Sequence, residues 1–350
     1  IMKPTKELLR KYARLLVRMG ANVQKVQVVS LSAAVDQHEF ACMVMEECYL
    51  AGAKKVDMDW SCDLQTRLNY LYADEAVLGE VQSWEVEKQK QAAVDLPCRI
   101  RIHSDDPDAL AGIDSEKISK VMQKRMMVLK HYRDAIDGRH QWLVASVPSK
   151  AWAMKCFPEY TAEVSMEKLW NAIFNTFRIT EDNDPVAEWQ AHCDFMLTKA
   201  DWLNQQHFTS LKYQSANGTD FTIGLIPQAS WAGAGCDNKE NGAYYVPNIP
   251  TEEVFTTPIA GVCEGTLVSV KPLSWKGQLI EDFSITFENG RAVSCKAREG
   301  QALLEQMIAI DEGSCMLGEV ALVPKESPVN QCGFLFYNTL FDENACCHMS

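Results

Sequence analysis

The spacing of apolar residues predicts alternating helices and strands in the first half of the chain. Apolar positions from Leu8 to Met19 recur with a helical period, Thr5 precedes them, and Gly20 ends the stripe. Further segments continue the alternation: a strand at 26–29, a helix at 38–51, a strand at 54–60, a strand at 99–103, a helix from 115 to about 133, and a strand at 141–147. Strand, helix and strand in this order form a βαβ unit, whose strands lie parallel.

The second half is predicted to be rich in antiparallel strands. Two helices, over 165–177 and 185–205, separate it from the first half. Asn217-Gly218 and Asn289-Gly290 are hairpin dipeptides, since glycine accepts a positive φ without steric cost. Before the second dipeptide, apolar and polar residues alternate as in a strand with one buried face. The apolar members of that strand are Phe283, Ile285 and Phe287.

These patterns predict the fold class α/β, in two domains. Residues 1–207 are expected to form an α/β domain with a mainly parallel sheet and trailing helices. Residues 208–350 are expected to form an α+β domain rich in antiparallel strands. A chain of 350 residues is long enough for two cores of this kind.

Composition narrows the function classes. The formal net charge of −13 argues against a nucleic-acid-binding protein, which would present a basic face. The sequence contains no apolar segment of 18 residues, so no membrane span is expected. Thirteen cysteines are spread along the chain without a Cys-x-x-Cys motif, a pattern that favours free thiols in a reducing cytoplasm.

Candidate chemistry lies in three separate phrases of the second half. Residues 248–258 (NIPTEEVFTTP) place Glu252 and Glu253 between two prolines, in an extended segment where neighbouring side chains point to opposite sides. Glu319 heads a strand-like run, and His348 ends the phrase FDENACCH. Carboxylates together with an imidazole suit Zn, Co or Mn, so these phrases form a candidate metal site, although each residue taken alone is more typical of an exposed charged side chain.

The same phrases give the chain a family resemblance. It resembles the thermophilic metalloaminopeptidases of the aminopeptidase T and aminopeptidase S type, over essentially its whole length. Beyond the three phrases, the resemblance rests on residues 6–17 (KELLRKYARLLV), 212–225 (KYQSANGTDFTIGL), 241–248 (NGAYYVPN) and 334–345 (FLFYNTLFDENA).

The resemblance implies a cytoplasmic, homodimeric exopeptidase that removes N-terminal residues from short peptides inside an enclosed cavity. By motif, Glu253, Glu319 and His348 correspond to ligands of two divalent metal ions (Zn, Co, Mn or Mg), and Glu319 to the bridging and catalytic carboxylate. Glu343 is expected to act in catalysis, and it and Glu252 are the candidates for binding the substrate amine or moving a proton.

The resemblance also implies a departure from the family. In family members the chain continues past the histidine, with a catalytic tyrosine and a His-x-Asp pair, so the sequence is expected to be shortened at its C-terminal end. The triplet His192-Cys193-Asp194 is interpreted as a coincidence, because residues two apart do not share a helix face. Two alternatives stay open: a catalytically impaired peptide-binding remnant, and a thiol-dependent hydrolase using Cys346 or Cys347.

Overall fold

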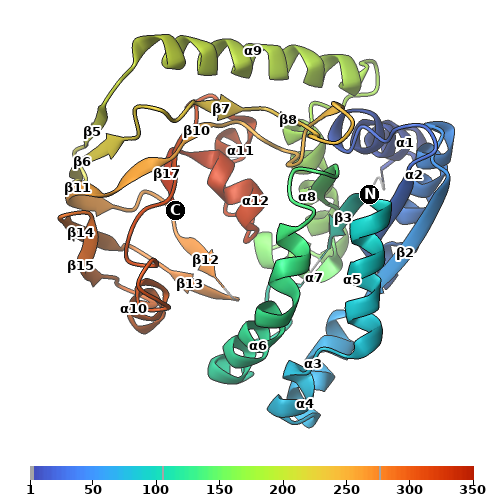
Figure 1. Cartoon of the computed structure of the whole chain (residues 1–350), viewed down its shortest axis with the longest axis horizontal. Coiled ribbons are helices and arrows are strands. Elements are labelled where there is room, and N and C mark those ends of the chain that lie inside the picture. The colour runs from blue at the N-terminus through green and yellow to red at the C-terminus, as the bar shows by residue number, and fades with distance from the viewer. Residues whose placement is uncertain (1–3, 105, 276) are drawn as a thin grey trace. The chain divides into compact units, whose positions relative to one another are not determined.

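The computed structural model describes residues 4–104, 106–275 and 277–350 (Figure 1). The chain divides into two compact units. Unit 1 comprises Ile1–Gln190 and Gly235–Ile249, and unit 2 comprises Ala191–Ala234 and Pro250–Ser350. The domain boundary expected after residue 207 stays a prediction.

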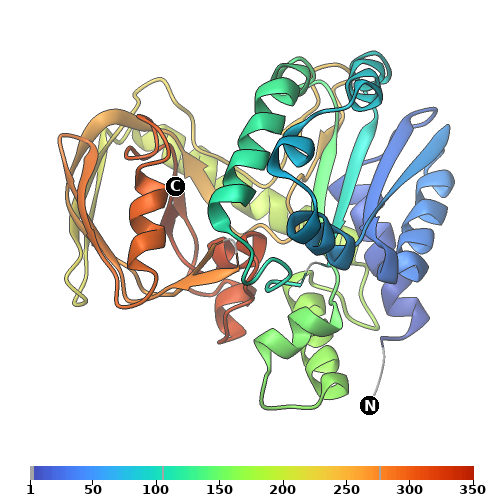
Figure 2. The same cartoon turned by 90° about the horizontal axis from the view of Figure 1, so that it is seen from below.

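Unit 1 is built on a four-stranded parallel sheet with the strand order β2-β1-β3-β4. Its strands are β1 (Val28–Ala34), β2 (Lys55–Ser61), β3 (Cys98–His103) and β4 (Trp142–Ser146). Its helices are α1 (Lys6–Leu15), α2 (His38–Leu50), α3 (Asp63–Tyr72), α4 (Glu75–Gly79), α5 (Ser83–Asp95), α6 (Ser115–Asp134), α7 (Lys150–Cys156) and α8 (Ala162–Thr176). Helices cover both faces of this sheet (Figure 2). Alternate residues of β1 and β3 are buried, whereas β2, at the edge of the sheet, is mostly exposed or half-buried.

Side-chain hydrogen bonds define the start of the first helix and attach it to the core. The Thr5 hydroxyl accepts a hydrogen bond from the Leu8 amide and caps α1. The helix continues into a π-helical turn, Leu16–Gly20. Tyr12 is fully buried, and its hydroxyl donates to the Ser146 carbonyl oxygen at 2.6 Å at the end of β4. Burial raises the pKa of Tyr12 well above its usual value.

Two details of unit 1 differ from the expectation. The first strand begins at Val28 instead of Val26, because Val26 has a positive φ of 63° and an exposed side chain. Helices α3, α4 and α5 fill the segment between β2 and β3, for which no helix was predicted. Leu64, Leu68 and Leu71 of α3 are exposed, so an apolar stripe is present there without a buried face.

Unit 2 contains a five-stranded antiparallel sheet with the order β15-β14-β11-β6-β5. Its strands are β5 (Ser210–Gln214), β6 (Asp220–Leu225), β11 (Pro258–Val268), β14 (Ser284–Glu288) and β15 (Arg291–Lys296). The sheet curves around helix α10 (Gln301–Ile308), as Figure 2 shows. Asn289 and Gly290 have φ values of 50° and 76° in the two-residue turn between β14 and β15, as predicted for this dipeptide.

A second, four-stranded sheet of unit 2 has the order β17-β16-β10-β7. Its strands are very short: β7 (Ala232–Gly233), β10 (Val254–Thr256), β16 (Val320–Leu322) and β17 (His348–Met349). The other elements of unit 2 are the hairpin of β12 (Leu273–Trp275) and β13 (Gln278–Ile280), helices α11 (Pro328–Gln331) and α12 (Thr339–Asp342), and the 3-10 turn Glu343–Ala345. Helix α9 (Pro185–Gln206) runs from unit 1 into unit 2. The parallel and antiparallel sheets confirm the predicted mixed α/β fold class.

Within the described residues, no helix is both long enough and apolar enough to cross a membrane.

Candidate metal centre

The register of the four-stranded sheet brings the three predicted metal ligands to one face. Phe255 of β10 is paired with Ala321 of β16, and Ala321 is paired with His348 of β17. Glu253 is two residues before Phe255 in the sequence, and Glu319 is two residues before Ala321. Side chains two apart along a strand point to the same face, so both glutamates share the face of His348.

The three side chains meet as ion pairs. The Nε2 atom of His348 lies 3.1 Å from Oε2 of Glu253 and 3.5 Å from Oε1 of Glu319. The side chains of Glu253 and His348 are nearly buried, with 12% and 18% exposed, whereas Glu319 is 35% exposed. Glu253 Oε2 nevertheless makes no hydrogen bond. Its contact with His348 is short enough for one, but the angle at the atoms is unfavourable.

A backbone hydrogen bond orients the imidazole. His348 Nδ1 donates to the Cys346 carbonyl oxygen at 3.3 Å, which directs Nε2 toward the two carboxylates. Histidines that bind metals are usually held in this way, with one nitrogen donating to an outer acceptor and the other free for the metal. Burial by itself would lower the pKa of His348, but the contacts with Glu253 and Glu319 outweigh it and raise the pKa to about 10.

The donor set fits a divalent metal ion in its chemistry. Two carboxylates and an imidazole nitrogen converge, and one buried carboxylate oxygen has no hydrogen bond. However, His348 contacts both carboxylates directly, and the three side chains leave no space for an ion between them. Among the described residues, no group of three or more His, Cys, Asp or Glu side chains is arranged to hold a metal ion. The side chains of Glu253, Glu319 and His348 would therefore have to move apart to admit one.

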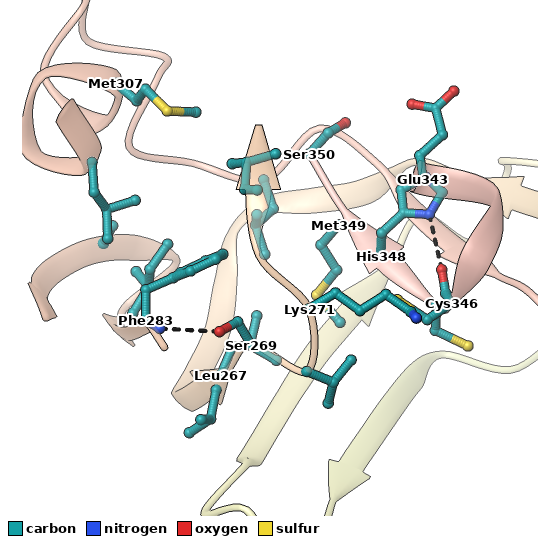
Figure 3. A pocket seen from close by; sticks show the side chains of 18 of the residues that line it. Leu267, Ser269, Lys271, Phe283, Met307, Glu343, Cys346, His348, Met349 and Ser350 are labelled. Carbon is teal, nitrogen blue, oxygen red and sulfur yellow. Dashed lines mark hydrogen bonds between the residues drawn. The ribbon is translucent and has the colours of Figure 1, made fainter. Parts of the chain in front are cut away.

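Glu343 lies in the 3-10 turn that precedes β17, beside a cavity of about 650 Å³ in unit 2. Burial raises its pKa to about 7, and the nearby charge of Glu253 adds to this effect. Glu343, Cys346 and His348 stand on one side of the cavity, and Phe283 and Met307 stand on the opposite side (Figure 3). The cavity is therefore lined by charged and polar side chains on one side and by apolar side chains on the other.

Glu252 faces away from this cluster. Its carboxylate is buried, and its Oε2 lies 3.5 Å from Nε2 of His192 in α9. The same His192 nitrogen donates to the Thr251 carbonyl oxygen at 2.9 Å. Glu252 is thus held on the opposite side of the extended segment from Glu253.

Sequence reasoning missed two residues that support this segment. His192 was set aside with Asp194, but in the structure Asp194 is exposed while His192 contacts Thr251 and Glu252. Asn344 accepts a hydrogen bond from the Glu252 amide at 2.7 Å and was not singled out at all. The signal for Asn344 was an amide side chain inside an otherwise apolar and acidic phrase, which is costly to bury without partners.

The two neighbouring thiols do not form a nucleophile–base pair with His348. Burial raises the pKa of the Cys346 thiol, the opposite of what thiolate chemistry requires. His348 Nδ1 contacts the backbone oxygen of Cys346 instead of its sulfur. The Cys347 sulfur accepts from the Val323 amide at 3.4 Å.

Comparison with known proteins gives a consistent result. A model of the family "Thermophilic metalloprotease (M29)" matches residues 5–350. Aminopeptidase AmpS of Bacillus subtilis (strain 168) is 42% identical over 343 residues, covering 98% of this chain and 83% of the relative. Aminopeptidase T of Thermus aquaticus is 34% identical over 345 residues, covering 98% of this chain and 84% of the relative. The structure of wild-type AmpT from Thermus thermophilus superposes with a TM-score of 0.91 at 32% identity, covering 98% of this chain and 85% of that one.

Proposed function

The chain belongs to the thermophilic metalloprotease (M29) family, and from that premise we propose that it releases N-terminal residues from short peptides at a site of two divalent metal ions. Membership makes it a metallo-exopeptidase that depends on a divalent metal and acts on peptides. The observation that supports the location of the site is the meeting of Glu253, Glu319 and His348 on one sheet face.

In the proposed site, Glu253, Glu319 and His348 would hold the metal ions, with Glu319 as the carboxylate common to both. Glu319 is also the most exposed of the three side chains, which places it at the open side of the cluster. Mixed carboxylate and imidazole ligands are compatible with Zn, Co, Mn or Mg.

A bound divalent metal supplies Lewis-acid polarisation of the scissile carbonyl and eases the ionisation of water at neutral pH. The protein supplies position and proton transfer. Glu343 borders the cavity next to His348, so we assign it the task of taking a proton from the attacking water and returning it to the leaving amine. The free amine of the peptide would face the carboxylates, and its N-terminal side chain would enter the cavity toward Phe283 and Met307.

We further propose that two copies of the chain associate and that the protein works in the cytoplasm. Support for the dimer comes from the resemblance to the aminopeptidases. Support for a reducing compartment comes from the thirteen cysteines, all of which are free. Light scattering of the purified protein tests the dimer directly: a monomer mass at micromolar concentration would contradict it.

The function is tested by metal removal and restoration. Stripping the full chain with a chelator should abolish hydrolysis of a dipeptide with a free N-terminus, and adding back Zn, Co, Mn or Mg in turn should restore it. The same peptide with an acetylated N-terminus should not be cleaved in any of these states.

Each alternative predicts a different pattern in the same experiment. Activity that survives complete metal removal but is lost after alkylation of thiols would support a thiol-dependent hydrolase. Weak metal binding without turnover would point to a catalytically impaired peptide-binding remnant. Absence of metal binding by the wild-type chain would overturn the proposal.

A further inference from the structure

The three segments that present Glu253, Glu319 and His348 are joined around one buried residue, Asn344. It lies in the 3-10 turn between α12 and β17, four positions before His348, and only 1% of it is exposed. Its Oδ1 accepts from the backbone amide of Glu252 at 2.7 Å. This hydrogen bond fixes the backbone immediately before Glu253.

The other groups of Asn344 complete the connection. Its Nδ2 donates to the Leu340 carbonyl oxygen at 2.9 Å in α12. Its backbone oxygen accepts from the Ser327 hydroxyl at 2.6 Å, and Ser327 is also 1% exposed. Ser327 lies at the start of α11, in the segment that follows β16 and hence Glu319. Asn344 therefore links the segments of all three proposed ligands.

The amide is chemically suited to this position. An asparagine side chain has both an acceptor and donors, and here each kind is used. A carboxylate of the same shape would keep the acceptor for the Glu252 amide but lose the donor to Leu340. It would also add charge beside a cluster that already contains several carboxylates.

We propose that Asn344 is a positioning residue of the metal centre, which holds the Glu253 segment beside the His348 segment. The inference rests on the proposed function. It assigns Asn344 no contact with substrate or metal, only with the backbone that carries the ligands. Outer residues of this kind change metal affinity by about 10- to 100-fold when they are removed.

The test compares Asn344→Ala with a matched control, Asn238→Ala, in the full chain. Asn238 is also a buried asparagine whose side-chain amide is used on both sides: Oδ1 accepts from the Glu240 amide at 2.7 Å and Nδ2 donates to the Gln141 side-chain oxygen at 2.9 Å. It lies in unit 1, whereas the three ligand segments lie in unit 2. Affinity for Zn²⁺ and for Co²⁺ is measured by competition with a chelator, and thermal unfolding is measured without metal.

Asn344→Ala should bind both ions about 10- to 100-fold more weakly, whereas Asn238→Ala should keep the wild-type affinity even where its unfolding temperature falls as far. Equal metal affinity in the two variants would overturn the inference and leave the proposed function intact. A wild-type chain that binds neither ion would overturn both.

A second variant keeps the inference testable if Asn344→Ala does not fold. Ser327→Ala removes the hydroxyl that donates to the Asn344 backbone oxygen and leaves the Asn344 side chain in place. It should weaken metal binding in the same direction by a smaller factor. Wild-type affinity in Ser327→Ala, with Asn344→Ala unfolded, would contradict a positioning role and reduce Asn344 to a part of the core.

Discussion

Glu252 and Glu253 are adjacent carboxylates in one extended segment, yet their surroundings differ. Glu252 lies beside His192, an imidazole supplied by a neighbouring helix. Glu253 lies among Glu319, Glu343 and His348, with a buried oxygen that makes no hydrogen bond. A buried carboxylate that is paired with an imidazole stabilises the local structure. A buried carboxylate oxygen that makes no hydrogen bond and lies near other carboxylates can bind a cation. Two residues of the same type, adjacent in the sequence, are thus expected to differ in role because their surroundings differ.

The largest effect is expected from Glu253→Gln. The amide keeps the shape but removes the negative charge that a metal ion needs, so affinity for Zn²⁺ should fall by more than the roughly 100-fold seen for outer residues. Turnover of a dipeptide should be lost with it. The measurement is chelator competition, together with circular dichroism to show that the variant is folded. Retention of wild-type affinity would remove Glu253 from the site.

A smaller effect, of a different kind, is expected from Glu252→Gln. The neutral amide removes the negative charge that lies 3.5 Å from Nε2 of His192, so the free energy of unfolding should fall by about 1 kcal/mol. Metal affinity should stay within a few-fold of wild type. Denaturant unfolding and metal competition measure the two quantities on the same sample. If both glutamate variants lost metal equally, the contrast between the two sides of the segment would be wrong.

The smallest effect is expected from Cys347→Ser. Cys347 precedes His348, and its sulfur accepts a long hydrogen bond from the Val323 amide, a contact that a hydroxyl can replace. Peptide turnover and metal affinity should both match the wild type, and iodoacetamide should not abolish activity. A dead but folded Cys347→Ser protein would instead favour the thiol-dependent alternative.

The sequence predicted the elements of unit 1 well, because they are long and periodic. The helix expected at 38–51 is His38–Leu50, and the strand expected at 99–103 is Cys98–His103. The helices between β2 and β3 escaped prediction for a physical reason. Their apolar residues, such as Leu64 and Leu71, are exposed, so hydrophobic spacing there did not mark a face that packs against a core.

The site was predictable only in part. Family motifs marked Glu253, Glu319 and His348, but strands of two and three residues are too short for a periodicity to reveal their register. The support from His192 and Asn344 could not be predicted either. Each reaches the segment before Glu253 from a distant part of the chain, through a single side chain with no repeating pattern. Only the tertiary structure places such residues.

The pairing of the short strand β17 has a consequence for the order in which parts of the chain are expected to fold. His348 reaches Glu253 only after β16 has paired with both β10 and β17, and the segments involved are far apart along the chain. Closing such long loops costs entropy that local helices do not have to offset, so we expect these contacts to form after the local helices. A Co²⁺ absorption signal would therefore follow completion of this sheet and appear after the helical signal of unit 1.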